Sequence, residues 1–266
     1  MFPPANYQLN QFPSSNLLRK MQFISDQDGI FKRYINEEGG WDSHLNNSKA
    51  FIRDCLKSQD ANSVSIMGSG WLLDVPVRFL AENYKEVIFY DLRHPVEIRH
   101  KYRDKSNFRF VEIDLTGGVI EQVYLFLNSK KNIDLQELEN LLIIPSVALP
   151  FQSDFLVSLN LLNQLDILII DYIRKKVNLP DDLASNMRAK IQQKHIELLN
   201  SGKSCMVTDF EEINHDSKNN IAQTKSLIHT TIDKSLIQKK WIWHFDSQMT
   251  YHKNLKTDFN VMAIKF

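Results

Sequence analysis

Short apolar runs alternate with helical patterns through the middle of this chain. Residues 64–67, 87–90 and 204–210 are apolar runs of strand length, and residues 108–113 alternate in polarity. Between them, residues 93–103 predict a short polar helix, and residues 181–202 predict an amphipathic helix that opens on two acids and stops at Gly202. This alternation predicts an α/β protein with a mostly parallel sheet.

The two ends of the chain depart from this alternation. Residues 1–16 predict an irregular arm, and residues 17–56 predict helices separated by Gly39 and Gly40. At the other end, strand-like runs at 241–245 and 260–266 flank a polar loop, which predicts an antiparallel pair. Residues 119–127 are compatible with a helix, but residues 119–150 as a whole suggest no function.

A glycine-rich turn follows the first predicted strand. Gly68, Ser69 and Gly70 make a sharp turn into a helix, and Asp91 ends the second strand 21 positions after Gly70. Strand, glycine turn, helix, strand and acid at this interval are typical of units that hold an adenosine, whose ribose hydroxyls bind the acid. The sequence therefore predicts an adenosine-binding site.

The residues after the turn bear on the kind of adenosine compound. A dinucleotide fingerprint needs a third glycine at position 73, where this chain has Leu73. Asp74 stands before Val75 and Pro76, so we expect it to cap the helix. A carboxylate at this place would repel a pyrophosphate but would tolerate a cationic sulfonium.

Here the chain resembles the class I S-adenosylmethionine-dependent methyltransferases, whose first strand leads into Gly-x-Gly and whose second strand ends in an acid. The resemblance implies that Asp91 binds the ribose and that Gly68, Ser69 and Gly70 lie under the methionine part. It also places Asp114, after the third strand, at the adenine amino group. Departures from the family pattern are Ile66, where many members have an acid, and Leu72, where many have a glycine.

The resemblance also assigns residues around the adenine and the reacting methyl group. Ile113 and Leu115 would flank the adenine ring. Asp154 would open the fourth strand, with Ser158 in contact with the cofactor and Asn160 orienting the acceptor. The Asn/Asp-Pro-Pro-Tyr signature of adenine-N6 and glutamine-amide methyltransferases is absent from the sequence, which argues against those targets.

Transfer to a hydroxyl or amine needs a base, and position suggests several candidates. Asp209 follows the fifth strand and His44 lies in the helical segment before the sheet, so both join Asn160 as catalytic candidates. Glu211, Glu212 and His215 are further candidates after the fifth strand. Trp41, His44 or Tyr34 would face the substrate. We favour the alternative, in which Trp41 packs on the core and His44 is a surface or capping residue.

Together these features predict a doubly wound, seven-stranded, mostly parallel sheet with an antiparallel C-terminal hairpin and an N-terminal helical extension. Residues 1–60 would form a helical arm or lid, and residues 61–266 a methyltransferase-like Rossmann domain. The chain would transfer a methyl group from S-adenosylmethionine to a small-molecule acceptor. Two alternatives stay open: a non-catalytic cofactor-binding or structural protein on the same scaffold, and an NAD-dependent oxidoreductase.

Composition narrows the partners. The 266 residues are 43% hydrophobic, and 32 Lys and Arg balance 32 Asp and Glu. A net charge near zero argues against nucleic acid as a partner. Cys55 and Cys205 lack metal-ligand spacing, and we expect no metal site. Since the sequence has neither a signal peptide nor an apolar run of membrane-spanning length, we expect a cytoplasmic protein. The oligomeric state is left open.

Overall fold

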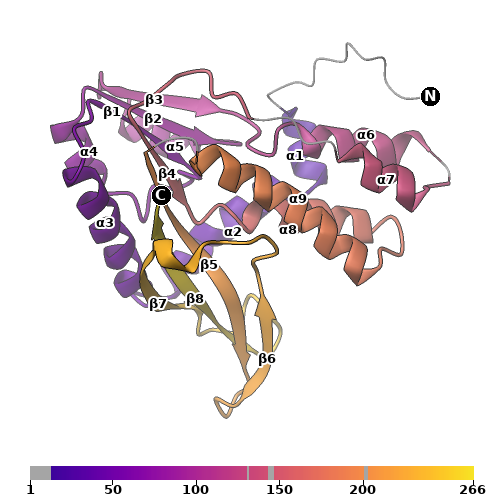
Figure 1. Ribbon diagram of the computed structural model, residues 1–266. Helices are drawn as coiled ribbons and strands as arrows, with labels where there is room; N and C mark the ends of the chain where they lie inside the picture. The colour runs from indigo at the N-terminus through magenta and orange to yellow at the C-terminus, as the bar shows by residue number, and fades with distance from the viewer. Residues whose placement is uncertain (1–12, 131, 143–146, 201–202) are drawn as a thin grey trace.

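The computed structural model describes residues 13–130, 132–142, 147–200 and 203–266, and its centre is one eight-stranded sheet (Figure 1). The strands are β1 (Ser63–Met67), β2 (Glu86–Asp91), β3 (Phe108–Glu112), β4 (Phe155–Leu159), β5 (Ser204–His215), β6 (Ile221–Ser226), β7 (Ile237–Asp246) and β8 (Lys256–Lys265). The order is β3-β2-β1-β4-β5-β8-β7, and β6 pairs with β5. Strands β1 to β5 are parallel, whereas β6, β7 and β8 join by antiparallel pairing.

Helices cover both faces of the sheet. They are α1 (Ser15–Lys20), α2 (Phe23–Asn36), α3 (Asp42–Lys57), α4 (Val77–Asn83), α5 (Val96–Lys101), α6 (Val119–Ser129), α7 (Leu135–Leu141), α8 (Gln164–Arg174) and α9 (Asp181–Asn200), with a short 3-10 turn at Lys234–Leu236. One buried cluster joins α3, α4 and α5 to the sheet, and a second joins α1, α6, α7, α8 and α9 to the other face. The result is a three-layer α/β/α sandwich.

This architecture confirms the predicted doubly wound sheet and its C-terminal antiparallel pair. The predicted glycine break agrees as well, since α2 ends at Asn36 and α3 begins at Asp42. The predicted helix over 119–127 corresponds to α6, which spans Val119–Ser129. Most of the predicted irregular arm and the predicted helix stop at Gly202 lie outside the described residues. The division at residue 60 stays a prediction; α3 shares a hydrophobic cluster with β1 and β2.

The eighth strand is an addition that the sequence pattern missed. β5 pairs with β4 through Val207 and continues to His215, where its second half pairs with β6 instead. All six β6 residues are exposed, so no alternation of buried and exposed positions marks this strand. The extension protrudes below the parallel strands in Figure 1, where β5 and β6 reach furthest from the helices.

No helix in the described parts of the chain combines the length and apolar character needed to cross a bilayer.

The turn after β1 fits closely against the end of β4. Gly68 has φ +77°, and a Cβ at this position would lie 2.5 Å from the carbonyl oxygen of Leu159. Gly68→Ala should therefore lower the free energy of unfolding by about 1–3 kcal/mol from backbone strain, and by more where the overlap persists. Urea unfolding of the purified protein measures this loss.

Gly29→Ala is the matched control, because Gly29 lies inside helix α2 and a Cβ there would meet no atom within 4 Å. We expect it to stabilise the protein by about 0.5–1 kcal/mol. Equal stability of the Gly68→Ala variant and the parent protein would contradict the close packing of the turn.

Candidate functional site

A cavity of about 220 Å³ lies at the carboxyl ends of β1, β2 and β4. The strand order reverses between β1 and β4, and ligands of open α/β sheets gather at such a switch point. Ten of the sequence-predicted site residues line this one cavity: Gly68, Ser69, Gly70, Asp91, Ile113, Asp114, Leu115, Asn160, Asp209 and His44. Ser158, the other predicted cofactor contact, is not among the lining residues.

The acid at the end of β2 holds the glycine turn. The Gly70 amide donates to Oδ2 of Asp91 over 2.7 Å. Further along, Leu72 adopts φ +57° while its side chain is buried, and its amide donates to the Ser69 carbonyl over 2.8 Å. Leu72 therefore keeps a left-handed backbone although it is not a glycine.

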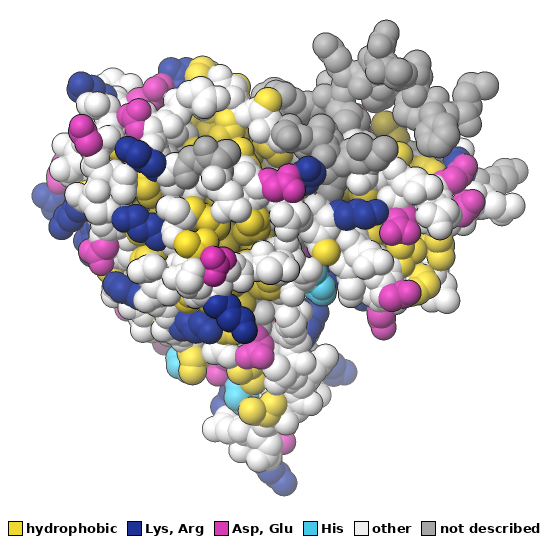
Figure 2. Space-filling model, in the orientation of Figure 1, with side chains coloured by type: hydrophobic (Ala, Val, Ile, Leu, Met, Phe, Trp, Pro, Cys, Tyr) yellow, Lys and Arg dark blue, Asp and Glu magenta, His cyan; other side chains and the backbone are white. Residues whose placement is uncertain are grey.

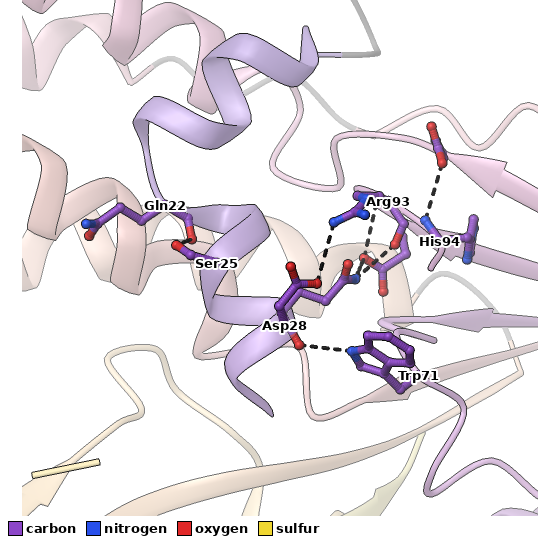
Figure 3. A network of polar contacts seen from close by, with 9 residues as sticks. Gln22, Ser25, Asp28, Trp71, Arg93 and His94 are labelled. Atoms are coloured by element: carbon purple, nitrogen blue, oxygen red, sulfur yellow. Dashed lines mark hydrogen bonds and ion pairs between the residues drawn. The ribbon is translucent and has the colours of Figure 1, made fainter. Parts of the chain in front are cut away.

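Helix α2 lies over the turn and the acid. The Trp71 indole donates to the carbonyl of Gln27, and the Gln27 amide donates to the carbonyl of Arg93, each over 2.9 Å. Figure 3 shows the Trp71 ring against the helix backbone and the Arg93 guanidinium turned toward Asp28, an ion pair of 3.6 Å. The Phe31 ring stacks on Trp71 with centroids 4.2 Å apart. These contacts fix α2 as the roof of the cavity.

An unpaired carboxylate oxygen marks the end of the cavity after β3. Asp114 is buried, and its Oδ1 accepts from the amide and hydroxyl of Thr116 over 2.8 and 2.5 Å. Its Oδ2 has no hydrogen-bond partner among the described residues. Burial raises the pKa of Asp114 to about 6 against the lowering effect of the Thr116 bonds. Ile113 and Leu115 are buried on either side.

Asp74 does not cap the helix, contrary to the sequence prediction. Helix α4 begins at Val77, after Pro76, without a side-chain cap. The Asp74 carboxylate instead accepts from the Asn160 amide over 2.7 Å, and burial raises its pKa to about 6. Asn160 follows the last residue of β4 with φ +46° and lines the cavity beside this carboxylate.

His44 is buried rather than at the surface, which corrects the favoured expectation. Its Nδ1 accepts from the Trp241 indole over 3.1 Å, and its ring stacks on Trp243 with centroids 4.0 Å apart. Burial lowers the pKa of His44 to about 3. A ring this reluctant to take a proton is unsuited to act as a general base at neutral pH. Trp41 packs in the core as expected.

Ser158 faces away from the cavity. It shares the β4 face of Leu156, and its hydroxyl lies 2.7 Å from Nε2 of His195 on α9. Because neighbouring strand residues point to opposite faces, Ser158 lies against α9. His195 is buried there with its pKa lowered by burial to about 4. The predicted cofactor contact of Ser158 is therefore corrected.

Asp209 lies at the opposite end of the cavity from Asp114. Asn163, the residue before α8, donates from its amide nitrogen to Oδ2 of Asp209 over 2.7 Å. Neither Oδ1 of Asn163 nor Oδ1 of Asp209 has a partner among the described residues. Burial raises the pKa of Asp209 to about 6, and the nearby Glu212 adds to the rise.

Glu212 and Tyr251 complete this end. Glu212 accepts from Nδ2 of Asn214 over 2.8 Å and lies 2.7 Å from Nε2 of His252. Burial, followed by the charge of Glu212, raises the pKa of Tyr251 above its usual range. The other two candidates after the fifth strand, Glu211 and His215, pair with β8 residues and are not among the cavity-lining residues.

Several lining residues were missed by sequence reasoning. Asn163, Tyr251, Gln27, Arg33 and Trp71 belong to helices or to a loop whose position against the strand ends depends on tertiary packing. Only Asn163 had a local signal, since it follows the fourth strand closely. Within the residues that the structure describes, no group of three or more His, Cys, Asp or Glu is placed to hold a metal ion.

No family model matches the sequence, and no curated protein matches it. Among solved structures, the chain is similar to the Burkholderia thailandensis 1,6-didemethyltoxoflavin-N1-methyltransferase, with 13% identity, 94% of this chain and 88% of that chain covered, and a TM-score of 0.44. It is also similar to the N-methyltransferase NodS from Bradyrhizobium japonicum, with 9% identity, coverage of 83% and 85%, and a TM-score of 0.39. Similarity at this level assigns no activity to the chain.

The buried Asp209 should destabilise the folded protein once it ionises. Its pKa is raised by burial, so the folded state binds a proton between the unfolded pKa and about 6 that the unfolded state has released. Stability from this group therefore falls as pH rises through that window. Asp209→Asn should raise the free energy of unfolding at pH ~7.5 by up to about 3 kcal/mol and leave it nearly unchanged at pH ~4.

Urea unfolding at the two pH values measures the difference. Asp216→Asn is the control with the opposite sign, because hydrogen bonds from Asn220 lower the pKa of Asp216. That variant should lose rather than gain stability at neutral pH. A gain for Asp209→Asn that does not grow with pH would contradict the penalty assigned to its charge.

Proposed function

We propose that this protein binds S-adenosylmethionine in the cavity and transfers its methyl group to a small-molecule acceptor. The observation that carries the proposal is the charge of the wall. Among the described residues, six carboxylates line the cavity with two guanidinium groups: Asp26, Asp74, Asp91, Asp114, Asp209 and Glu212, with Arg33 and Arg93. An acidic wall favours a cationic sulfonium and opposes the pyrophosphate of NAD.

The adenosine end fits the donors of this cofactor. Oδ2 of Asp114 has no close hydrogen-bond partner among the described residues, and the Gly118 and Ile120 backbone amides, which lower the pKa of this carboxylate, offset its burial only in part. An adenine amino group would supply the donor, between Ile113 and Leu115. Asp91 already accepts from Gly70 through Oδ2, and its Oδ1 has only contacts of 3.5 Å, to Gln27 and Arg93. Those long contacts leave Oδ1 available for a ribose hydroxyl.

In the part of the cavity that would hold the methionine moiety of the cofactor, the acid is Asp74 rather than a residue at position 66. The chain has Ile66 where many methyltransferases have an acid, but the Asp74 carboxylate reaches the cavity wall beside Asn160. Asp74 would compensate the positive charge of the amino group and the sulfonium. Burial raises the pKa of Asp74 although the charge of Lys49 acts in the opposite direction, so a cationic ligand would stabilise the charged carboxylate further.

In this proposal the chain positions the reactants and keeps water out. S-adenosylmethionine, when bound, supplies an electrophilic methyl group. Helix α2 roofs the site, with Trp71 and Gln27 holding it over Asp91. Asp209 would accept a proton from the acceptor; it lines the cavity with an unpaired Oδ1, and its raised pKa of about 6 suits a general base. A cavity of about 220 Å³ favours a small acceptor.

On the face drawn in Figure 2, Lys and Arg side chains are interspersed with Asp and Glu, a pattern that supports a small-molecule partner over a polyanion.

Binding of the cofactor is the first prediction of this function. Calorimetric titration should detect S-adenosylmethionine and S-adenosylhomocysteine, but not NADH. Asp91→Ala should abolish measurable binding, because the turn and the ribose both depend on this carboxylate. Asp114→Asn should weaken binding about tenfold, since one hydrogen bond at a buried site is disturbed.

Glu86→Gln is the matched control, because Glu86 begins the same strand at its opposite end and makes an exposed ion pair with Arg109. Its affinity should equal that of the parent protein. Tight NADH binding without a response to S-adenosylmethionine would favour the oxidoreductase alternative. Binding of the cofactor without methyl transfer to any acceptor would favour the non-catalytic scaffold.

A further inference from the structure

We propose that the methyl acceptor is an amine, whose nitrogen is held by the side chains of Asn163 and Asp209. This inference rests on the proposed function and names the class of acceptor for the same site.

The pair presents two unpaired acceptors and no free donor. Asn163 is 4% exposed and Asp209 5%, and Oδ1 of each has no partner among the described residues. The orientation of the Asn163 amide is fixed because its nitrogen donates to Oδ2 of the carboxylate. An amine brings two or three N–H donors, enough for both oxygens, whereas a hydroxyl brings one. An amine therefore satisfies this pair where a hydroxyl leaves one oxygen unpaired.

Backbone pairing places the pair beside the end of β4, where the methyl group would lie. The backbone N–H of Asn160 donates to the backbone carbonyl of Val207 over 2.8 Å, and Asp209 stands two positions beyond Val207 on β5. Asn163 stands three positions beyond Asn160 and bonds to Asp209. Both members of the pair are thus anchored to the same junction of β4 and β5.

The neighbouring wall already accommodates a cation. The Arg33 guanidinium lies 4.7 Å from the ring centre of Phe245 and 5.0 Å from that of Tyr251. Trp243 and Phe259 extend this aromatic wall along the cavity. Aromatic faces and carboxylates stabilise an ammonium group, so a protonated amine can enter. Arg33 Nε and Trp243 Nε1 are donors without partners among the described residues, and they would serve an acceptor's other polar groups.

In the transfer, the ammonium form of the acceptor gives one proton to Asp209, which frees the nitrogen lone pair. The nitrogen forms a bond to the methyl carbon, the bond between that carbon and sulfur breaks, and its electron pair stays on sulfur. The products are the N-methylated ammonium and S-adenosylhomocysteine, and Asp209 releases its proton to solvent.

Sinefungin tests the pair without knowledge of the acceptor. In this analogue an amine-bearing carbon replaces the methylsulfonium, so its ammonium group points to where the acceptor nitrogen would lie. We expect calorimetry at pH ~7.5 to show sinefungin binding about tenfold or more tighter than S-adenosylhomocysteine. Asn163→Leu and Asp209→Asn should reduce this ratio to about threefold or less, while the affinity for S-adenosylhomocysteine stays within about threefold.

Asn163 is suited to substitution because its side chain makes no capping bond to α8. Asn128→Leu is the control: Asn128 is an exposed α6 residue that bonds to Tyr172 and does not line the cavity. The ratio of sinefungin to S-adenosylhomocysteine affinity in Asn128→Leu should equal that of the parent protein. Far-ultraviolet circular dichroism confirms that each variant is folded.

Equal affinities for the two ligands in the parent protein, or an unchanged ratio in Asn163→Leu, would overturn the amine assignment while leaving the cofactor in place. Failure of both ligands to bind the folded parent protein would overturn the proposed function and this inference with it.

Discussion

The bond from the Gly70 amide to the Asp91 carboxylate is the contact on which the rest of the site depends. It joins the turn after β1 to the end of β2, and so places Trp71 where its indole reaches α2. Gln27 on that helix then contacts the same carboxylate over 3.5 Å. Asp91 thus fixes both the glycine turn and the position of α2, so a ligand that binds Asp91 lies between the turn and this helix.

The buried carboxylates around the cavity lower the stability of the folded protein when they are ionised. Asp74, Asp114 and Asp209 each have a pKa raised by burial to about 6, so their charged forms are disfavoured in the folded protein. Proteins keep such groups at functional sites, where the binding of an oppositely charged or hydrogen-bond-donating ligand offsets the unfavourable burial. The acidic wall is therefore better explained by a ligand than by the fold.

The sequence was most informative where an acidic residue follows an apolar strand. Asp91 and Asp114 could be placed because an acid after an apolar run leads to the carboxyl edge of a parallel sheet. The prediction for Ser158 named the right strand but the wrong face of the sheet, because the side chain packs against α9. His44 was misjudged for a related reason: the stacking of Trp243, almost two hundred positions away in the chain, buries it. The extension of β5 escaped detection because β6 has no buried positions.

Leu72 shows that one left-handed position of the turn does not need a glycine, whereas Gly68 has no room for a side chain. A leucine stays in the left-handed region at φ +57° because its side chain is buried in the core and its amide is bonded to Ser69. Surrounding contacts thus hold this left-handed conformation at a residue other than glycine. A search that scores consecutive glycines would overlook chains of this kind, whereas one that scores an acid at the next strand end would retain them. Distant members of such folds are better sought by the partners of the turn than by the turn itself.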